Sequence, residues 1–148
     1  MTPSTEEVSL IVRAIQLAVA PVFLLTGLGA LLSVMATRLG RVIDRARQVE
    51  GGWKSLDEPD RAKARIELGT LDKRAHLASW AINFCTSAAL LVCAVIATLF
   101  IDVFVGTNLK WLVGALFIAA MLALIGGLAS FLREVYLATH TLRIGPPE

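Results

Sequence analysis

The stretch TRLGRVIDRARQVE, residues 37–50, carries four arginines directly behind residues 14–37, which contain no charged side chain. An uncharged apolar segment of about 20 residues is long enough to cross a bilayer as a helix. Basic residues that follow such a segment are retained on the cytoplasmic side of the membrane. The stretch therefore predicts a membrane anchor that ends at a cytoplasmic surface.

Composition supports a small membrane protein. The chain has 148 residues, of which 56% are apolar, and its mean hydropathy is +0.70. An ordinary soluble domain is about one half apolar. The net charge of +2 is too small to indicate nucleic-acid binding, and the aromatic residues do not interleave with basic ones. We expect one membrane domain, residues 1–148, that does not bind nucleic acid.

Three segments are apolar enough to span the membrane: residues 15–37, 77–101 and 111–132. The first is not a cleavable signal peptide, because Glu6 and Glu7 precede it and its apolar core is too long. The sequence predicts a multi-pass membrane protein.

Lysine and arginine counts predict its orientation. Residues 38–76 contain ten lysines and arginines, whereas residues 1–14 contain only Arg13 and residues 102–110 contain only Lys110. By the positive-inside rule, the long loop 38–76 is cytoplasmic, together with the tail 133–148. The N-terminus and the short turn 102–110 then lie outside.

An apolar pattern with steps of three and four residues continues through the loop. It predicts an all-α fold in which the first two spans extend into the cytoplasm as an antiparallel, coiled-coil-like hairpin. Gly51 and Gly52 should end the first arm, by a positive φ, and Asp57 and Pro59 should begin the second. The two rows of apolar residues are Leu25, Leu28, Leu32, Met35, Leu39, Val42, Ala46 and Val49, and Ala64, Leu68, Leu71, Ala75, Ala78, Ile82, Cys85, Ala89, Val92, Ile96 and Leu99.

Charged residues border both rows of the predicted hairpin. Arg41 and Arg47 flank the first row, and Glu67 and Asp72 flank the second. We expect cross-hairpin ion pairs that involve Glu67, Asp72 and Arg74. Exposed pairs contribute about 0–1 kcal/mol each to stability, so their role would be to set the register of the two arms against each other.

The arginines behind the first span form a candidate binding site. On a helix, Arg38, Arg41 and Arg45 fall within about 60° of arc, close to the headgroup level. We expect them, together with Arg47, to contact anionic lipid or an acidic partner. Asp44, three residues from both Arg41 and Arg47, would brace the group. The alternative is that these arginines only orient the chain during insertion.

Small residues recur every four positions in the second and third spans. Such stripes allow close approach of helix backbones. They predict helix packing, within the chain or against another subunit, through Ala81, Cys85, Ala89, Cys93 and Ala97 and through Ala115, Ala119, Ala123 and Gly127.

The pattern Arg38-x-x-Arg41-x-x-Asp44-Arg45-x-Arg47, with Glu67, Arg74-Ala75 and Phe131-Leu132-x-Glu134, resembles a family. It is a bacterial family of small integral membrane proteins classed as a domain of unknown function. The resemblance covers residues 8–143 and implies three membrane helices. It implies no substrate, reaction or cofactor.

The residues themselves do not form a recognisable catalytic motif. Cys85 and Cys93 lie about 12 Å apart along one helix, too far for a disulfide, and have no zinc-site spacing. His76 and His140 are expected to be interfacial or solvated, the alternative being a haem held between them. We expect neither an enzyme nor a bound cofactor or metal.

Two function classes remain. The first is a structural or regulatory scaffold that forms a homo-oligomer or docks a membrane-protein partner through its hairpin. The second is a homo-oligomeric channel for ions or small solutes, with a pore lined either by Thr26, Ser33 and Thr37 or by Asn83, Thr86, Ser87 and Thr98. Because hydroxyls can bond to their own helix and an intramembrane charge is lacking, the scaffold ranks first.

Overall fold

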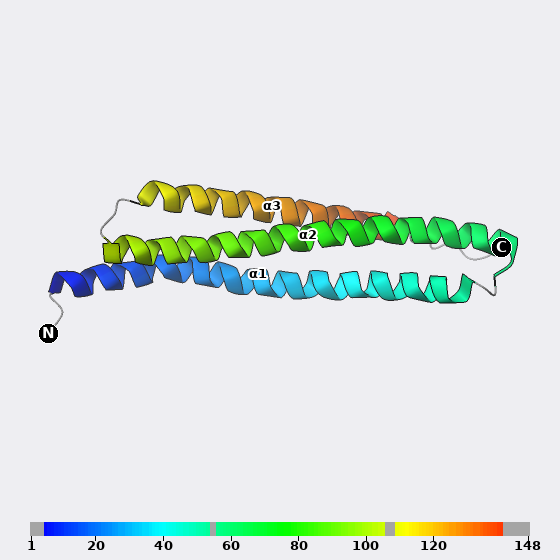
Figure 1. Cartoon of the computed structure of the whole chain (residues 1–148), viewed down its shortest axis with the longest axis horizontal. Helices are drawn as coiled ribbons and strands as arrows, with labels where there is room; N and C mark the ends of the chain where they lie inside the picture. The colour runs from blue at the N-terminus through cyan, green and yellow to red at the C-terminus, as the bar shows by residue number, and fades with distance from the viewer. Residues whose placement is uncertain (1–4, 54–55, 106–108, 141–148) are drawn as a thin grey trace. The chain divides into compact units, whose positions relative to one another are not determined.

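The computed structural model describes residues 5–53, 56–105 and 109–140. Three α-helices follow one another in the chain: α1 (Thr5–Gly52), α2 (Glu58–Val105) and α3 (Lys110–His140) (Figure 1). The described residues contain no strand. All three helices are long and apolar enough to cross a membrane, which indicates a multi-pass membrane protein.

The helices extend beyond the predicted spans. At 1.5 Å per residue, the 48 residues of α1 and of α2 each measure about 72 Å, more than twice the ~30 Å hydrocarbon core. Helix α3 continues past residue 132 to His140, so the first part of the predicted tail 133–148 is helical. Residues 141–148 lie outside the described residues.

The break between α1 and α2 falls where the sequence predicts it. Helix α1 ends at Gly52, although neither Gly51 nor Gly52 adopts the positive φ that we expected. The carbonyl of Asp57 accepts the N–H of Arg61 at 2.9 Å, which makes Asp57 the residue that caps α2. Pro59 lies in the first turn, where its missing N–H costs no helical hydrogen bond.

The described residues form two compact units: those up to residue 32 with those between 84 and 125, and those between 33 and 83 with those from 126 onward. In the first unit, small and branched side chains make up the core. Its buried hydrophobic residues are Ala18 and Leu28 of α1, Cys85, Ala88, Val92 and Val95 of α2, and Ala120 of α3.

The first unit also contains the cap of α3. The N–H of Leu109 donates to Asp102 Oδ1 at 3.0 Å, and the carbonyl of Leu109 accepts the N–H of Val113. A carboxylate is stabilising at a helix N-terminus, where unpaired N–H groups concentrate positive charge. Asp102 is half-buried in this role.

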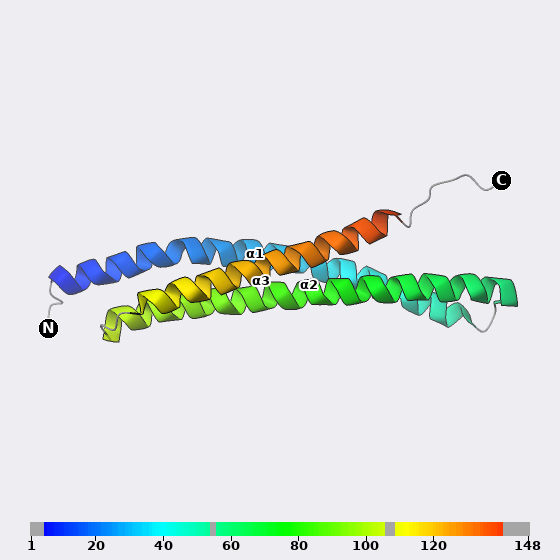
Figure 2. The same ribbon diagram turned by 90° about the horizontal axis from the view of Figure 1, so that it is seen from above.

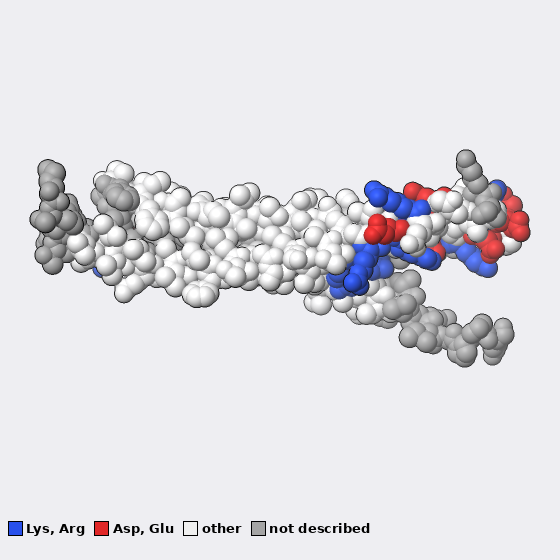
Figure 3. Space-filling view, turned by 90° about the horizontal axis from the view of Figure 1, so that it is seen from below, with Lys and Arg blue, Asp and Glu red and all other residues white. Residues whose placement is uncertain are grey.

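In the second unit, the end of α1 (residues 33–52) and the beginning of α2 (residues 58–83) run antiparallel; we call this pair of arms the hairpin (Figure 1). The predicted apolar rows face inward here: Met35, Val42, Ala64, Leu71 and Ala78 are buried. Residues 126–140 of α3 lie against the hairpin, and Figure 2 shows the last turns of α3 diverging from α2. On the face drawn in Figure 3, acidic and basic side chains of this unit gather together.

Candidate functional site

A buried carboxylate joins the three helices of the second unit. Glu134 of α3 is 1% exposed, on the same helix face as Gly127 and one heptad beyond it. Its Oε1 accepts hydrogen bonds from Arg74 Nη2 at 3.0 Å and Nε at 3.3 Å. Its Oε2 lies 3.5 Å from Arg38 Nη2. We call Arg38, Arg74 and Glu134 the three-helix ion cluster.

Because Glu134 is buried, the ion pairs of this cluster affect the stability of the protein more than exposed pairs would. Removing a carboxylate from water is costly unless cations and hydrogen bonds replace the solvent. Two guanidinium groups compensate Glu134, and Arg38 additionally lies 5.4 Å from the ring centre of Phe131. These contacts fix the directions in which Arg38 and Arg74 project.

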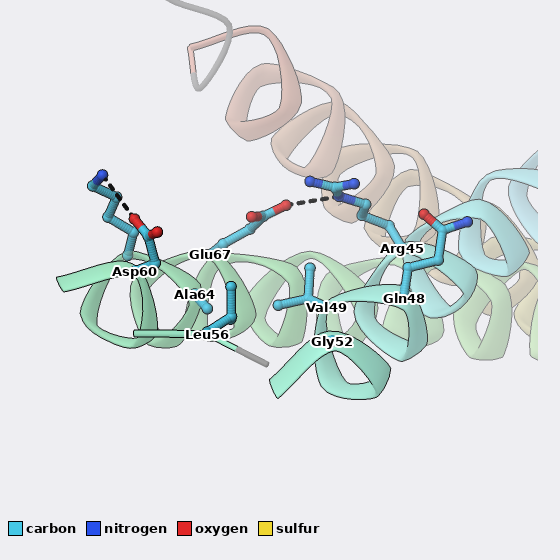
Figure 4. A pocket seen from close by; sticks show the side chains of 9 residues that line it. Arg45, Gln48, Val49, Gly52, Leu56, Asp60, Ala64 and Glu67 are labelled. Atoms are coloured by element: carbon cyan, nitrogen blue, oxygen red, sulfur yellow. Dashed lines mark hydrogen bonds and ion pairs between the residues drawn. The ribbon is translucent and has the colours of Figure 1, made fainter. Parts of the chain in front are cut away.

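Glu67 forms an ion pair across the hairpin, although with Arg45 and not with Arg41 or Arg47, the arginines that we expected to border it. Arg45 Nε lies 2.8 Å from Glu67 Oε1, as drawn in Figure 4. Both side chains are well exposed, at 56% and 41%, so the pair contributes about 0–1 kcal/mol.

The other two residues predicted for such pairs behave differently. Within the described residues Arg74 makes no ion pair across the hairpin, because its guanidinium group binds the buried Glu134 of α3 instead. Asp72 forms no ion pair with any of the described residues. It lies instead at the exposed edge of a groove.

Asp44 does not brace its neighbours in the structure. It is exposed, and within the described parts of the chain it makes no ion pair with Arg41 or Arg47. An exposed pair at this spacing gains only a few tenths of a kcal/mol, which does not offset the loss of side-chain freedom. Arg41 is likewise exposed and without an ion pair among the described residues.

Four arginines line one cavity of about 270 Å³, which we call the arginine cavity. Its walls are Arg38, Arg41 and Arg45 of α1 and Arg74 of α2, with Val42 and Leu71 as apolar members. The structure thus gathers three of the four predicted arginines and adds Arg74. Arg47 lies elsewhere, on the groove described next.

A second cavity, of about 480 Å³, forms what we call the hairpin groove. The less exposed members of its lining are apolar: Val42, Ala46, Leu68, Leu71 and Ala75. Its exposed members are Ile43, Arg47, Glu50, Gly69 and Asp72. A third cavity, of about 300 Å³, lies at the closed end of the hairpin beside Arg45 and Glu67 (Figure 4).

The small-residue stripes are divided between buried and exposed positions. Ala81, Cys85 and Gly127 are buried, and Ala89, Ala115 and Ala123 are half-buried. Cys93, Ala97 and Ala119 are exposed. On α3 the buried positions are Ala120, Gly127 and Glu134, which follow a spacing of seven residues. Packing of the exposed stripe members against another subunit stays a prediction.

Of the two histidines, His76 has a hydrogen-bond partner in the structure. His76 Nε2 accepts a hydrogen bond from Trp80 Nε1 at 2.9 Å, which engages one of its ring nitrogens. The side chain of His140 lies outside the described residues. No three His, Cys, Asp or Glu side chains lie together in a metal-binding arrangement within the part of the chain that was searched.

Sequence reasoning missed Glu134 as a site residue. A signal for it existed, because it is an acidic residue just past the third apolar segment and one heptad after Gly127. Its position continues a row of small residues, which places it toward the other helices.

Comparison with known proteins gives the family. A family model described as "Protein of unknown function (DUF2721)" matches residues 18–144. The chain belongs to DUF2721. This match confirms the resemblance noted in the sequence, and it includes every residue of the three-helix ion cluster. No curated protein and no solved structure matches the chain.

Proposed function

We propose that this DUF2721 protein is a structural scaffold of the bacterial inner membrane that assembles by pairing its hairpins. In this proposal the hairpin projects into the cytoplasm, with the N-terminus outside and the C-terminus inside. The protein needs no cofactor and catalyses no reaction. The observation that carries the proposal is the hairpin groove, about 480 Å³ in volume, with an apolar floor and a charged rim.

The groove has the properties of a docking surface for a second copy. An apolar stripe between charged residues is what an amphipathic helix recognises. The rim carries both signs, with Arg47 and Glu50 on α1 and Asp72 on α2. Two copies related by a two-fold axis can therefore place Arg47 of one opposite an acidic residue of the other.

Hydrogen bonding favours the scaffold over a channel. Thr26 and Thr37, two of the candidate pore-lining residues, donate to the carbonyls of Val22 and Ser33 of their own helix. Thr98 does the same to Ala94 at 2.7 Å. Hydroxyls satisfied in this way need no water-filled pore.

A steric substitution tests the proposal. Gly69 lies on the rim, and a Cβ placed there meets no atom within 4 Å, so Gly69→Phe should leave the single chain folded and fill the mouth of the groove. Gly51→Phe is the matched control, because Gly51 is equally open but does not line the groove. Native mass spectrometry of the protein in detergent should show loss of the oligomer for Gly69→Phe alone.

Charge exchange provides a second test. Arg47→Glu and Asp72→Arg should each weaken self-association because like charges then face one another. Mixing the two variants should restore mixed oligomers if the rims pair across the interface. A wild-type protein that is monomeric at all concentrations in both detergent and lipid nanodiscs would refute the scaffold proposal.

A further inference from the structure

The arginine cavity has more positive charge than the surrounding acids compensate. Arg38 and Arg74 share the single carboxylate of Glu134, and Arg45 pairs with Glu67. Arg41 has no ion pair among the residues that the structure describes. Four guanidinium groups therefore face two carboxylates, which leaves an excess of two positive charges.

Hydrogen-bond donors are also left over. A guanidinium group carries five N–H donors in a planar fork. Arg45 uses its Nε on Glu67, and Arg74 uses its Nε and one Nη2 donor on Glu134. Among the described residues, the one carboxylate that Arg38 approaches is Glu134, at the longer distance of 3.5 Å. Most of the donors around the cavity thus stay available to a ligand.

The cavity is arranged before any ligand arrives. Glu134 and Phe131 hold Arg38, Glu134 holds Arg74, and Glu67 holds Arg45. Side chains that are already ordered lose little conformational entropy on binding. The ligand would have to order the exposed Arg41, and in part Arg45, because the pair between Arg45 and Glu67 is itself exposed.

We infer that the arginine cavity binds a phosphate group, with a dianionic phosphomonoester preferred over a monoanionic phosphodiester. Arginine forks match phosphate oxygens in bidentate geometry, and two negative charges balance the excess of two. A volume of about 270 Å³ lies below the ~300–1,000 Å³ typical of pockets for larger ligands, so it suits one headgroup-sized anion. Val42 and Leu71 provide apolar contact beside it.

The place of these residues in the chain points to lipid as the first source to test. Arg38 is the first charged residue after the uncharged residues 14–37, and Arg74 is the last before the uncharged residues 75–101. Basic residues at the ends of apolar spans lie at the level of lipid headgroups. Val42 and Leu71 line both the arginine cavity and the hairpin groove, but none of the four arginines lines the groove, so substitution of Arg41 tests phosphate binding separately from the proposed pairing of hairpins.

Titration of the purified full-length protein in neutral detergent tests the inference. The probes are dioctanoyl phosphatidic acid (a monoester), dioctanoyl phosphatidylglycerol (a diester), glycerol 3-phosphate and inorganic phosphate, with bound mass read by native mass spectrometry. One phosphatidic acid should bind per chain, about tenfold more tightly than phosphatidylglycerol. If glycerol 3-phosphate or inorganic phosphate binds as tightly as phosphatidic acid, the site takes a soluble phosphate rather than a lipid.

Substitutions assign the binding to this cavity. Arg41→Gln should weaken phosphatidic acid binding about tenfold or more. Arg41→Lys keeps the positive charge but lacks the guanidinium fork, so its affinity for phosphatidic acid should lie between those of wild type and Arg41→Gln. Arg65→Gln is the control, because Arg65 is an exposed arginine of the hairpin that lines neither the arginine cavity nor the hairpin groove, and this variant should bind like wild type. Equal affinity in wild type and Arg41→Gln, or no bound phosphate with any probe, would overturn the inference. Equal affinity for monoester and diester would overturn the charge preference.

Discussion

Arg74 of α2 and Glu134 of α3 are joined by two hydrogen bonds to one carboxylate oxygen, at 3.0 and 3.3 Å, although 60 positions separate them in the chain. The carboxyl group is almost completely buried, and Arg38 of α1 approaches its second oxygen. All three helices of the second unit therefore contribute one charged side chain to a single contact. A substitution in this cluster should therefore disturb contacts of all three helices of the unit.

Arg74→Gln should destabilise the protein strongly. Glu134 would keep its charge and lose its closest cation, which typically costs about 3–5 kcal/mol for a buried pair. Arg45→Gln, which removes the exposed pair with Glu67, should cost about 0–1 kcal/mol. Denaturant unfolding in detergent micelles, with tryptophan fluorescence as the probe, measures both. Equal effects of the two substitutions would show that burial does not set the energy of the cluster.

Removing the whole cluster should be tolerated better than removing one partner. The triple variant Arg38→Met, Arg74→Leu and Glu134→Leu replaces the three charged groups by apolar side chains that need no desolvation. Such replacements of buried ion networks are often neutral or stabilising. Its unfolding midpoint should lie well above that of Arg74→Gln, and a midpoint at or below that value would contradict the explanation.

Asp102→Ala should loosen the beginning of α3. The N–H of Leu109 would lose its acceptor, at a cost of about 1 kcal/mol, whereas Asp102→Asn retains a carbonyl oxygen and should cost less. Hydrogen–deuterium exchange of peptides that cover residues 109–113 is the measurement. Exchange should quicken in Asp102→Ala and stay near the wild-type rate in Asp102→Asn. Unchanged exchange in both variants would mean that this hydrogen bond does not hold the helix end.

Labelling of introduced cysteines tests the proposed orientation. In a background of Cys85→Ala and Cys93→Ser, a cysteine at the exposed position 110 should react with a membrane-impermeant maleimide added to spheroplasts. A cysteine at position 58, whose Glu58 side chain is 88% exposed, should react only after permeabilisation. The opposite pattern would reverse the orientation predicted from the basic residues.

Proline substitution tests the continuity of α1 through its arginines. Ala46→Pro should separate the hairpin arm from the preceding span, because an interior proline costs about 3 kcal/mol or more. Glu58→Pro should be tolerated, since it replaces the first residue of α2, where no helical N–H bond is lost. Circular dichroism and limited proteolysis of the two variants would compare them. Equal proteolytic resistance at both positions would argue against one continuous helix.

The sequence alone determined the three helices, the break after Gly52 and the faces that turn inward. Each depends on local or periodic properties: length and apolarity for the spans, glycine and a cap at Asp57 for the break, and a repeat of three and four residues for the buried face. Met35, Val42, Leu71 and Ala78 are buried where the pattern predicts them.

The tertiary structure alone decided which charges meet. From its position on α2, the side chain of Arg74 could contact either α1 or α3. The periodicity of apolar residues in α2 does not indicate which of these two helices packs beside Arg74. Only the packing of α3 brings Glu134 to Arg74 and Arg38. Arg41 is left without an ion pair among the described residues, and four arginines surround one cavity. The sequence could locate the arginines near the end of a membrane span, but their partners depend on contacts between distant segments, because the energy of an ion pair is set by separation in space and by burial.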